Sequence, residues 1–126
     1  PSPLPLSGTL APGQRAVIAS PALVIPGGVV VVRFPMDGVV QNGDPDGLCI
    51  WDTLRLECVS ALSYGGAITM ATHMGRTFSL VSMTATAARD SMTAVRSLCR
   101  TPDLANTGND SVDWLACATP TPGAPN

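Results

Sequence analysis

The chain has 126 residues, a formal net charge of −2 and only 13% charged residues, and all seven of its positive charges are arginines. It contains no basic stripe, which argues against a nucleic-acid surface, and no apolar run of about 18 residues, which argues against a membrane span. Twelve glycines and twelve prolines interrupt it, so long helices are excluded and a small all-β module is predicted.

Short apolar runs separated by turn residues predict a series of strands. Residues 14–20 and 29–34 are the first two, and the second contains four consecutive valines, which fit a pleated surface and lose rotamer freedom in a helix. Because an exposed run of this kind promotes aggregation, we expect it in the core or paired on both sides. Residues 48–51 and 54–62 then form a predicted hairpin around a tight turn.

The second half of the chain is less regular, and residues 67–92 show only weak periodicity. Four positions between residues 88 and 99 fall on helical spacing, but the poor helix formers Thr93 and Val95 lie among them. A loop followed by a strand is therefore preferred there. Residues 112–117 are the final predicted strand, and residues 119–126 are an extended proline-rich tail. About seven short, mostly antiparallel strands in one domain, residues 1–126, predict an all-β sandwich.

The four cysteines are better explained by two disulfides than by a zinc site. None lies in a C-x-x-C arrangement, and the single histidine, His73, is far from all of them along the chain. Three pairings are open, and the nearest-neighbour set is preferred because a turn signal separates the members of each pair. Each bridge would then join the two arms of one hairpin and imply an oxidising compartment, hence a secreted or cell-surface protein. The preferred pairs are Cys49–Cys58 and Cys99–Cys117. Trp51 and Trp114, each near one bridge, are expected in the hydrophobic core.

Several turn-rich strings occur in a recognisable order: LAPGQRAVIAS, QNGDPDGLCIWD, LECVSALSYGG, SLCRTPD, NDSVDW and CATPTPGAPN. In this order they resemble the bacterial, exported form of the lamin-tail domain over about residues 6–126. The C-terminal portion is the most specific part, and its matching positions are Ser97, Leu98, Arg100, Pro102, Asp103, Asp113, Trp114 and residues 121–126. The resemblance implies an immunoglobulin-like β-sandwich attached to other domains of a larger protein.

The strands that usually open the family, which contain a Glu-Phe-Val-Glu-Leu-Tyr-Asn-like stretch, have no counterpart in this chain. The chain is therefore expected to be part of a longer polypeptide and to have one uncovered sheet edge. An uncovered edge attracts another strand. The predicted partner is thus a protein, through self-association or strand pairing.

The sequence offers little material for catalysis. It has one histidine, one glutamate and no lysine, and it lacks a G-x-S-x-G elbow and a phosphate-binding glycine motif. No catalytic residue is assigned and no enzyme activity is expected.

One stretch has the composition of a calcium site, because five oxygen-bearing side chains fall within eleven residues. Calcium prefers six to eight oxygen ligands in flexible loops. The preferred alternative is a solvated hairpin loop whose Asp and Asn side chains hold the turn. The candidate ligands are Asp103, Asn106, Asn109, Asp110 and Asp113.

The sequence therefore predicts a non-catalytic structural or binding module of a secreted or cell-surface bacterial protein, serving adhesion or spacing and needing no cofactor. The arginine-only composition, rich in alanine, proline and glycine, is the basis for the bacterial origin. Two alternatives remain open. One is an accessory domain of an exported hydrolase whose catalytic groups lie outside this chain, and the other is a calcium-stabilised adhesion module.

Overall fold

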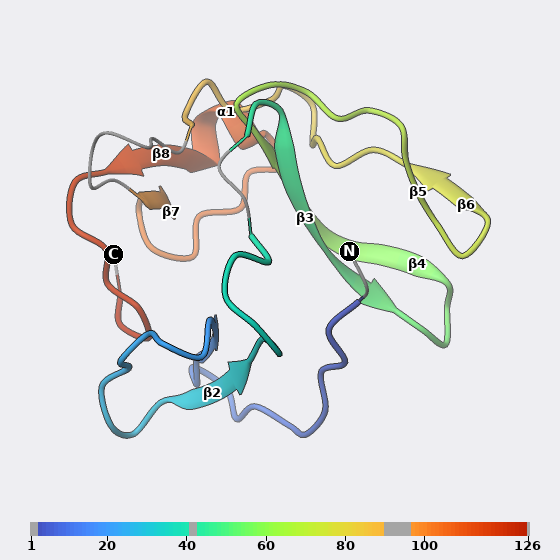
Figure 1. The fold of residues 1–126 in the computed structure, drawn as a ribbon. Helices are drawn as coiled ribbons and strands as arrows, with labels where there is room; N and C mark the ends of the chain where they lie inside the picture. Colours follow the sequence, from blue (N-terminus) through green and yellow to red (C-terminus); the bar gives the residue numbers. More distant parts are fainter. Residues whose placement is uncertain (1–2, 41–42, 90–96, 126) are drawn as a thin grey trace. The chain divides into compact units, whose positions relative to one another are not determined.

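The computed structural model describes residues 3–40, 43–89 and 97–125 of an all-β protein (Figure 1). Its contacts divide the chain into two compact units. The first unit comprises residues 1–41 and 121–125, and the second comprises residues 42–120. The prediction that residues 1–126 form a single domain stays a prediction. Among the described residues, no helix is long and apolar enough to cross a membrane.

The first unit is built on a parallel pair of strands, β1 (Ala16–Ala19) and β2 (Val30–Arg33). Parallel neighbours usually need a crossover of a dozen residues or more, whereas residues 20–29 suffice here. The Arg33 side chain supports this short crossover, because its Nη1 donates to the carbonyl oxygens of Ser20 and Leu23, each at 2.7 Å.

The valine run was expected in the core or paired on both sides, and this prediction is wrong for the described residues. β2 pairs with β1 alone, Val30 is 38% exposed, and Val31 and Val32 are half-buried. The physical reason is that a two-stranded ladder covers little surface. Ala19 on β1 is the one fully buried apolar side chain among the described residues of this unit.

The C-terminal segment lies outside the sheets, as predicted, but it is not fully extended. The Ala124 N–H donates to the Thr121 carbonyl at 3.0 Å and closes a turn. Gly123 adopts φ +83°, and a Cβ at this position would lie 2.7 Å from Cγ2 of Val29. A glycine is therefore required where this turn meets the start of the valine run.

Three antiparallel hairpins lie in the described part of the second unit, and the longest joins β3 (Asp46–Asp52) to β4 (Glu57–Tyr64) with a register shift between Ile50 and Trp51. The structure confirms the predicted hairpin, with its second arm beginning at Glu57, and a final strand that begins at Trp114, because residues 112–113 belong to the one-turn helix α1. The hairpin of residues 71–78 was not predicted, and residues 90–96, where a loop, strand or helix was considered, lie outside the described residues. The remaining elements are β5 (Ala71–His73), β6 (Arg76–Phe78), β7 (Ser97–Arg100), α1 (Asp110–Asp113) and β8 (Trp114–Cys117).

The two disulfides have the predicted pairing. Cys49–Cys58 joins β3 to β4, and Cys99–Cys117 joins β7 to β8, each with a Cα–Cα distance of 6.0 Å, within the usual range for a bridge. The strands confirm the all-β class. Those described form four two-stranded ladders: β1–β2, β3–β4, β5–β6 and β7–β8. Stacking of these ladders into a sandwich stays a prediction.

The apolar core of the second unit is small. Leu62, Tyr64, Leu80 and Cys99 are its buried apolar side chains among the described residues. Gly47 makes room for one of them, because a Cβ there would lie 2.7 Å from Cδ1 of Leu80 and 2.9 Å from the carbonyl oxygen of Leu62. Glycine at position 47 thus lets Leu80 pack directly on the β3–β4 ladder.

The β5–β6 turn gives the first testable prediction. Met74 and Gly75 both have positive φ, +47° and +75°, as a type I′ hairpin turn requires. Methionine is poorly suited to this conformation, whereas asparagine tolerates it. Met74→Asn is therefore expected to raise the free energy of unfolding by roughly 0.5–1 kcal/mol, measured by chemical denaturation.

Met70→Asn is the matched control, because Met70 is similarly exposed and has an ordinary φ. Its stability should stay close to that of the parent. Equal effects of the two substitutions would contradict the turn argument.

Candidate functional site

The predicted calcium segment folds around the one-turn helix α1, and its two most buried carboxylates face backbone donors. Asp110 is 3% exposed, and its Oδ2 accepts a hydrogen bond from the Ser82 N–H at 2.7 Å. The Asp110 N–H donates in return to the Ser82 carbonyl at 3.2 Å. Asn109 caps the helix, its Oδ1 accepting from the Ser111 N–H at 3.2 Å and hydroxyl at 2.8 Å. Both side chains therefore hold local structure.

Asp113 is 1% exposed and has the same kind of role. Its two carboxylate oxygens accept from the Thr107 N–H at 3.1 and 2.9 Å. Burial alone would raise the pKa of Asp113, but hydrogen bonds from Thr107 and Gly108 and the charge of Arg100 outweigh it and hold the pKa below its ordinary value. The ionised form is the one that this fold stabilises.

The other two candidate ligands do not complete a metal site with these residues. Asn106 is exposed, and Asp103 is half-buried and engaged in an interaction of its own. Among the described residues, no three Asp, Glu, His or Cys side chains are grouped so that they could hold a metal ion. The arrangement matches the alternative in which Asp and Asn side chains hold the turn, and calcium binding stays a prediction.

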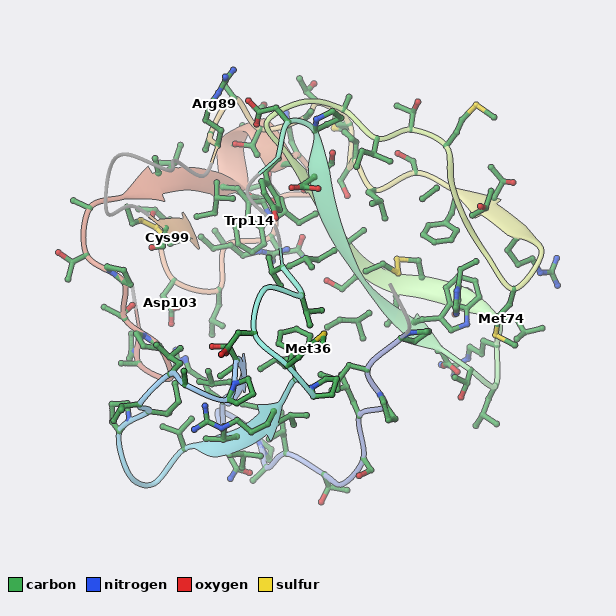
Figure 2. All side chains as sticks on the ribbon, in the orientation of Figure 1. Met36, Met74, Arg89, Cys99, Asp103 and Trp114 are labelled. Atoms are coloured by element: carbon green, nitrogen blue, oxygen red, sulfur yellow. A yellow bond between two sulfur atoms is a disulfide. The ribbon has the colours of Figure 1, made fainter. Side chains whose placement is uncertain are left out.

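Two positions that carry the lamin-tail resemblance meet across the β7–β8 ladder. Arg100 is the register partner of Trp114, and its guanidinium carbon lies 4.8 Å from the indole centroid, a cation–π contact. Arg100 Nη1 also donates to the Ala105 carbonyl at 2.8 Å, and the Thr86 hydroxyl donates to the Trp114 carbonyl at 2.6 Å. Figure 2 shows Trp114 on β8 and Cys99 on the adjacent β7. These contacts fix the end of the chain's last hairpin.

A pocket of about 420 Å³ lies between the end of the β3–β4 hairpin and strand β6. We call it the tip pocket. Its apolar wall is formed by Trp51 and Phe78, whose ring centroids are 5.3 Å apart at an interplanar angle of 40°. His73 packs edge-on against Trp51, with centroids 4.8 Å apart at 85°. The single histidine therefore packs against a residue of this wall and is not part of the pocket lining.

The hairpin end that borders the tip pocket is fixed by Asp52. Its Oδ1 accepts from the N–H groups of Leu54 at 2.8 Å and Arg55 at 3.0 Å. The hydrogen bonds from Arg55 and Leu54, together with the charge of Arg55, lower the pKa of Asp52. The Cys49–Cys58 disulfide closes the same end of the hairpin, and Trp51 is the register partner of Cys58.

Two guanidinium groups and one carboxylate provide the charge of the tip pocket. Arg55 is paired with Asp52 at 3.1 Å, and its side chain is 73% exposed. The Arg76 side chain has no ion pair or hydrogen bond within the described part of the chain, and the same holds for the Glu57 carboxylate. The indole Nε1 of Trp51 is buried and likewise has no acceptor there. The pocket thus combines an aromatic wall with one guanidinium, that of Arg76, which has no partner in the described part of the chain.

The sequence analysis missed the tip pocket. It placed Trp51 in the core, where the structure makes it half-buried and part of a wall. The local signal was weak, because the turn is Met74–Gly75 in place of the usual Asn-Gly or Asp-Gly and each flanking strand has only three residues.

No protein-family model, no curated protein and no solved structure matches this chain in sequence or structure comparison.

Asp110 provides a prediction on the role of the calcium segment. Asp110→Ala removes the acceptor of the part-buried Ser82 N–H, and we expect a loss of about 1–3 kcal/mol in the free energy of unfolding, because an unpaired donor remains. Asp37→Ala is the control, since Asp37 is exposed and has no partner among the described residues. Its stability should be nearly unchanged.

Thermal melting of the parent and of Asp110→Ala in millimolar calcium and in chelator tests whether this segment binds calcium. We expect equal melting temperatures, because backbone donors already occupy Asp110 and Asp113. A calcium-dependent rise that Asp110→Ala abolishes would instead establish a metal site.

The lowered pKa values of Asp52 and Asp113 predict the direction of the pH dependence. A folded-state pKa below the unfolded value of about 3.9 means that the ionised carboxylate contributes stability above about pH 4, and that this contribution is lost as the pH falls through the folded pKa. The melting temperature should therefore be nearly constant from about pH 7 to 5 and fall below about pH 4.

Asp113→Asn should lower the melting temperature at pH 7 and make its decline below pH 4 shallower, because one of the two carboxylates with a lowered pKa is gone. A melting temperature that rises on acidification would show that the sign is wrong.

Proposed function

We propose that the chain is a non-catalytic structural or binding module of an exported bacterial protein. The observation that supports this most is the pair of disulfides, each closing one hairpin. Disulfides of this kind persist in oxidising compartments and are rare in reducing ones. A secreted or cell-surface location follows from this proposal.

The roles of the polar side chains favour a structural or binding function over catalysis. Asp46, Asp52, Asp110 and Asp113 all accept hydrogen bonds from nearby backbone N–H groups. His73 packs against an aromatic ring. A general acid or base must be free to exchange a proton with a substrate, and these groups are engaged in holding turns and packing.

We also propose that the chain is a lamin-tail domain of the bacterial exported type. The order of its turn-rich strings is the basis of this assignment. The Arg100–Trp114 contact adds support, because it gives two of the matching positions a shared task in one hairpin.

Strand pairing is the mode of assembly that we propose for the module. Among the described residues, β2 pairs with β1 alone and presents half-buried or exposed valines. Such an edge is a template for a further strand. A second copy or a strand of another protein would satisfy it.

The cysteines of the native protein test the proposed location. When the protein is purified without reductant, no thiol should react with a titrant even after denaturation, and peptide mapping should recover Cys49–Cys58 and Cys99–Cys117. Reduction should lower stability, by up to about 2.7 and 3.2 kcal/mol for the two loops in the chain-entropy model. Four reactive thiols in native material, or thiolates bound to zinc, would overturn the proposal.

The same oxidised sample tests assembly. A mass above the 12.9 kDa of one chain, measured in solution, is expected for strand pairing between copies. Val31→Lys should return the protein to the single-chain mass, because a charge on the edge strand blocks pairing. A single-chain mass for the parent at all concentrations would exclude self-association.

A further inference from the structure

The tip pocket has the volume of a small-molecule site and an aromatic wall, whereas most of the residues that line it are polar or charged. Its volume of about 420 Å³ falls within the range of about 300–1,000 Å³ that is typical of ligand pockets. Such pockets combine apolar and aromatic walls with a few polar groups that fix the orientation of the ligand. Trp51 and Phe78 provide the wall here, and Arg55, Arg76 and Glu57 provide the charge.

Arg76 is the group that decides the class of ligand. A guanidinium presents five donors in a planar fork that matches a carboxylate, and it stays charged at all ordinary pH values. The roles of the neighbouring arginines differ: Arg55 is paired with Asp52, and Arg89 is paired with Asp44 at 3.1 Å. Arg76 alone among these three has no partner in the described part of the chain.

The aromatic wall indicates the shape of the uncharged part of the ligand. Trp51 and Phe78 pack on each other with centroids 5.3 Å apart and a 40° tilt, and both are half-buried and line the pocket, so the apolar part of the wall is aromatic and suits a flat or ring-shaped group. The Cys49–Cys58 bridge closes the hairpin end that carries Trp51, and His73 packs against the Trp51 ring. Because the wall is fixed before binding, little ordering entropy has to be spent on it.

We propose that the tip pocket binds a small monocarboxylate with a ring-shaped body. The carboxylate lies against the guanidinium of Arg76, and the ring lies against Trp51 and Phe78. Glu57, the one carboxylate of the lining, disfavours ligands with a second negative charge. This inference deepens the binding role in the proposed function and rests on it.

Nuclear magnetic resonance of the indole N–H groups gives a direct test, because the chain has only two tryptophans. The oxidised protein, labelled with nitrogen-15, is titrated with benzoate and with glucuronate, and with the uncharged analogues benzyl alcohol and glucose. The Trp51 signal, assigned with Trp51→Phe, should shift saturably with at least one acid, whereas the Trp114 signal stays in place. The uncharged analogue should bind at least ten-fold more weakly.

The two acids distinguish the sources of the ligand. Saturation by benzoate alone assigns an aromatic acid, saturation by glucuronate alone assigns an acidic sugar, and saturation by both assigns any ring-bearing carboxylate that fits. Absence of a Trp51 shift with either acid, or equal binding of an uncharged analogue, would overturn the proposal.

Charge variants test the assigned contact. Arg76→Gln should weaken binding about ten-fold or more, and Glu57→Gln should strengthen it several-fold. Arg89→Gln is the matched control, because it removes the same charge outside the pocket and should leave the dissociation constant unchanged. An unchanged Trp114 signal shows that each variant is folded, so unaltered binding by Arg76→Gln would count against the proposal itself.

The ligand and location proposals fail in distinguishable ways. Oxidised cysteines without a Trp51 shift would be consistent with the exported module and would contradict the proposed ligand. Free thiols together with a saturable Trp51 shift would support the ligand pocket and contradict the exported location.

Discussion

Hydrogen bonds from four buried polar side chains hold the loops of the second unit against its strands and its one-turn helix. The Ser63 hydroxyl donates to the Gly66 carbonyl at 2.7 Å and accepts from the Ile68 N–H at 3.0 Å. Thr86, Asp110 and Asp113 likewise form hydrogen bonds with backbone groups around α1 and β8. Because a buried partner left unpaired costs more than the bond gains when it forms, these groups hold the loops between ladders in one arrangement. They also explain why the carboxylates of this region serve the fold.

The disulfides complement this polar network. A two-stranded ladder is marginally stable in water by itself, and the described apolar core of the second unit consists of few side chains. Each bridge constrains the unfolded chain and closes one hairpin. Small exported domains use such crosslinks where burial alone is insufficient. The two disulfides therefore add the stability that the small described core of the second unit does not supply by burial.

The described arginines fall into three kinds of environment. Arg33 and Arg100 donate to loop carbonyls and support a crossover and a hairpin end. Arg55 and Arg89 form ion pairs whose exposure keeps their contribution small. Arg76 stands beside an aromatic wall with no partner in the described part of the chain. This difference from the other arginines is why the ligand contact proposed for the tip pocket is assigned to Arg76.

The sequence by itself predicted the all-β class, the hairpin around residues 48–62 and a final strand, and it favoured the observed disulfide set among three, because turn residues, β-branched runs and cysteine spacing are local signals. Tertiary structure alone decided the rest. The burial of the valine run depends on how many partners a strand finds, and the role of Asp110 depends on Ser82, which is distant in sequence. The tip pocket likewise joins Trp51 to Phe78 across two hairpins. Such contacts are long-range, and no local pattern encodes which segments will meet.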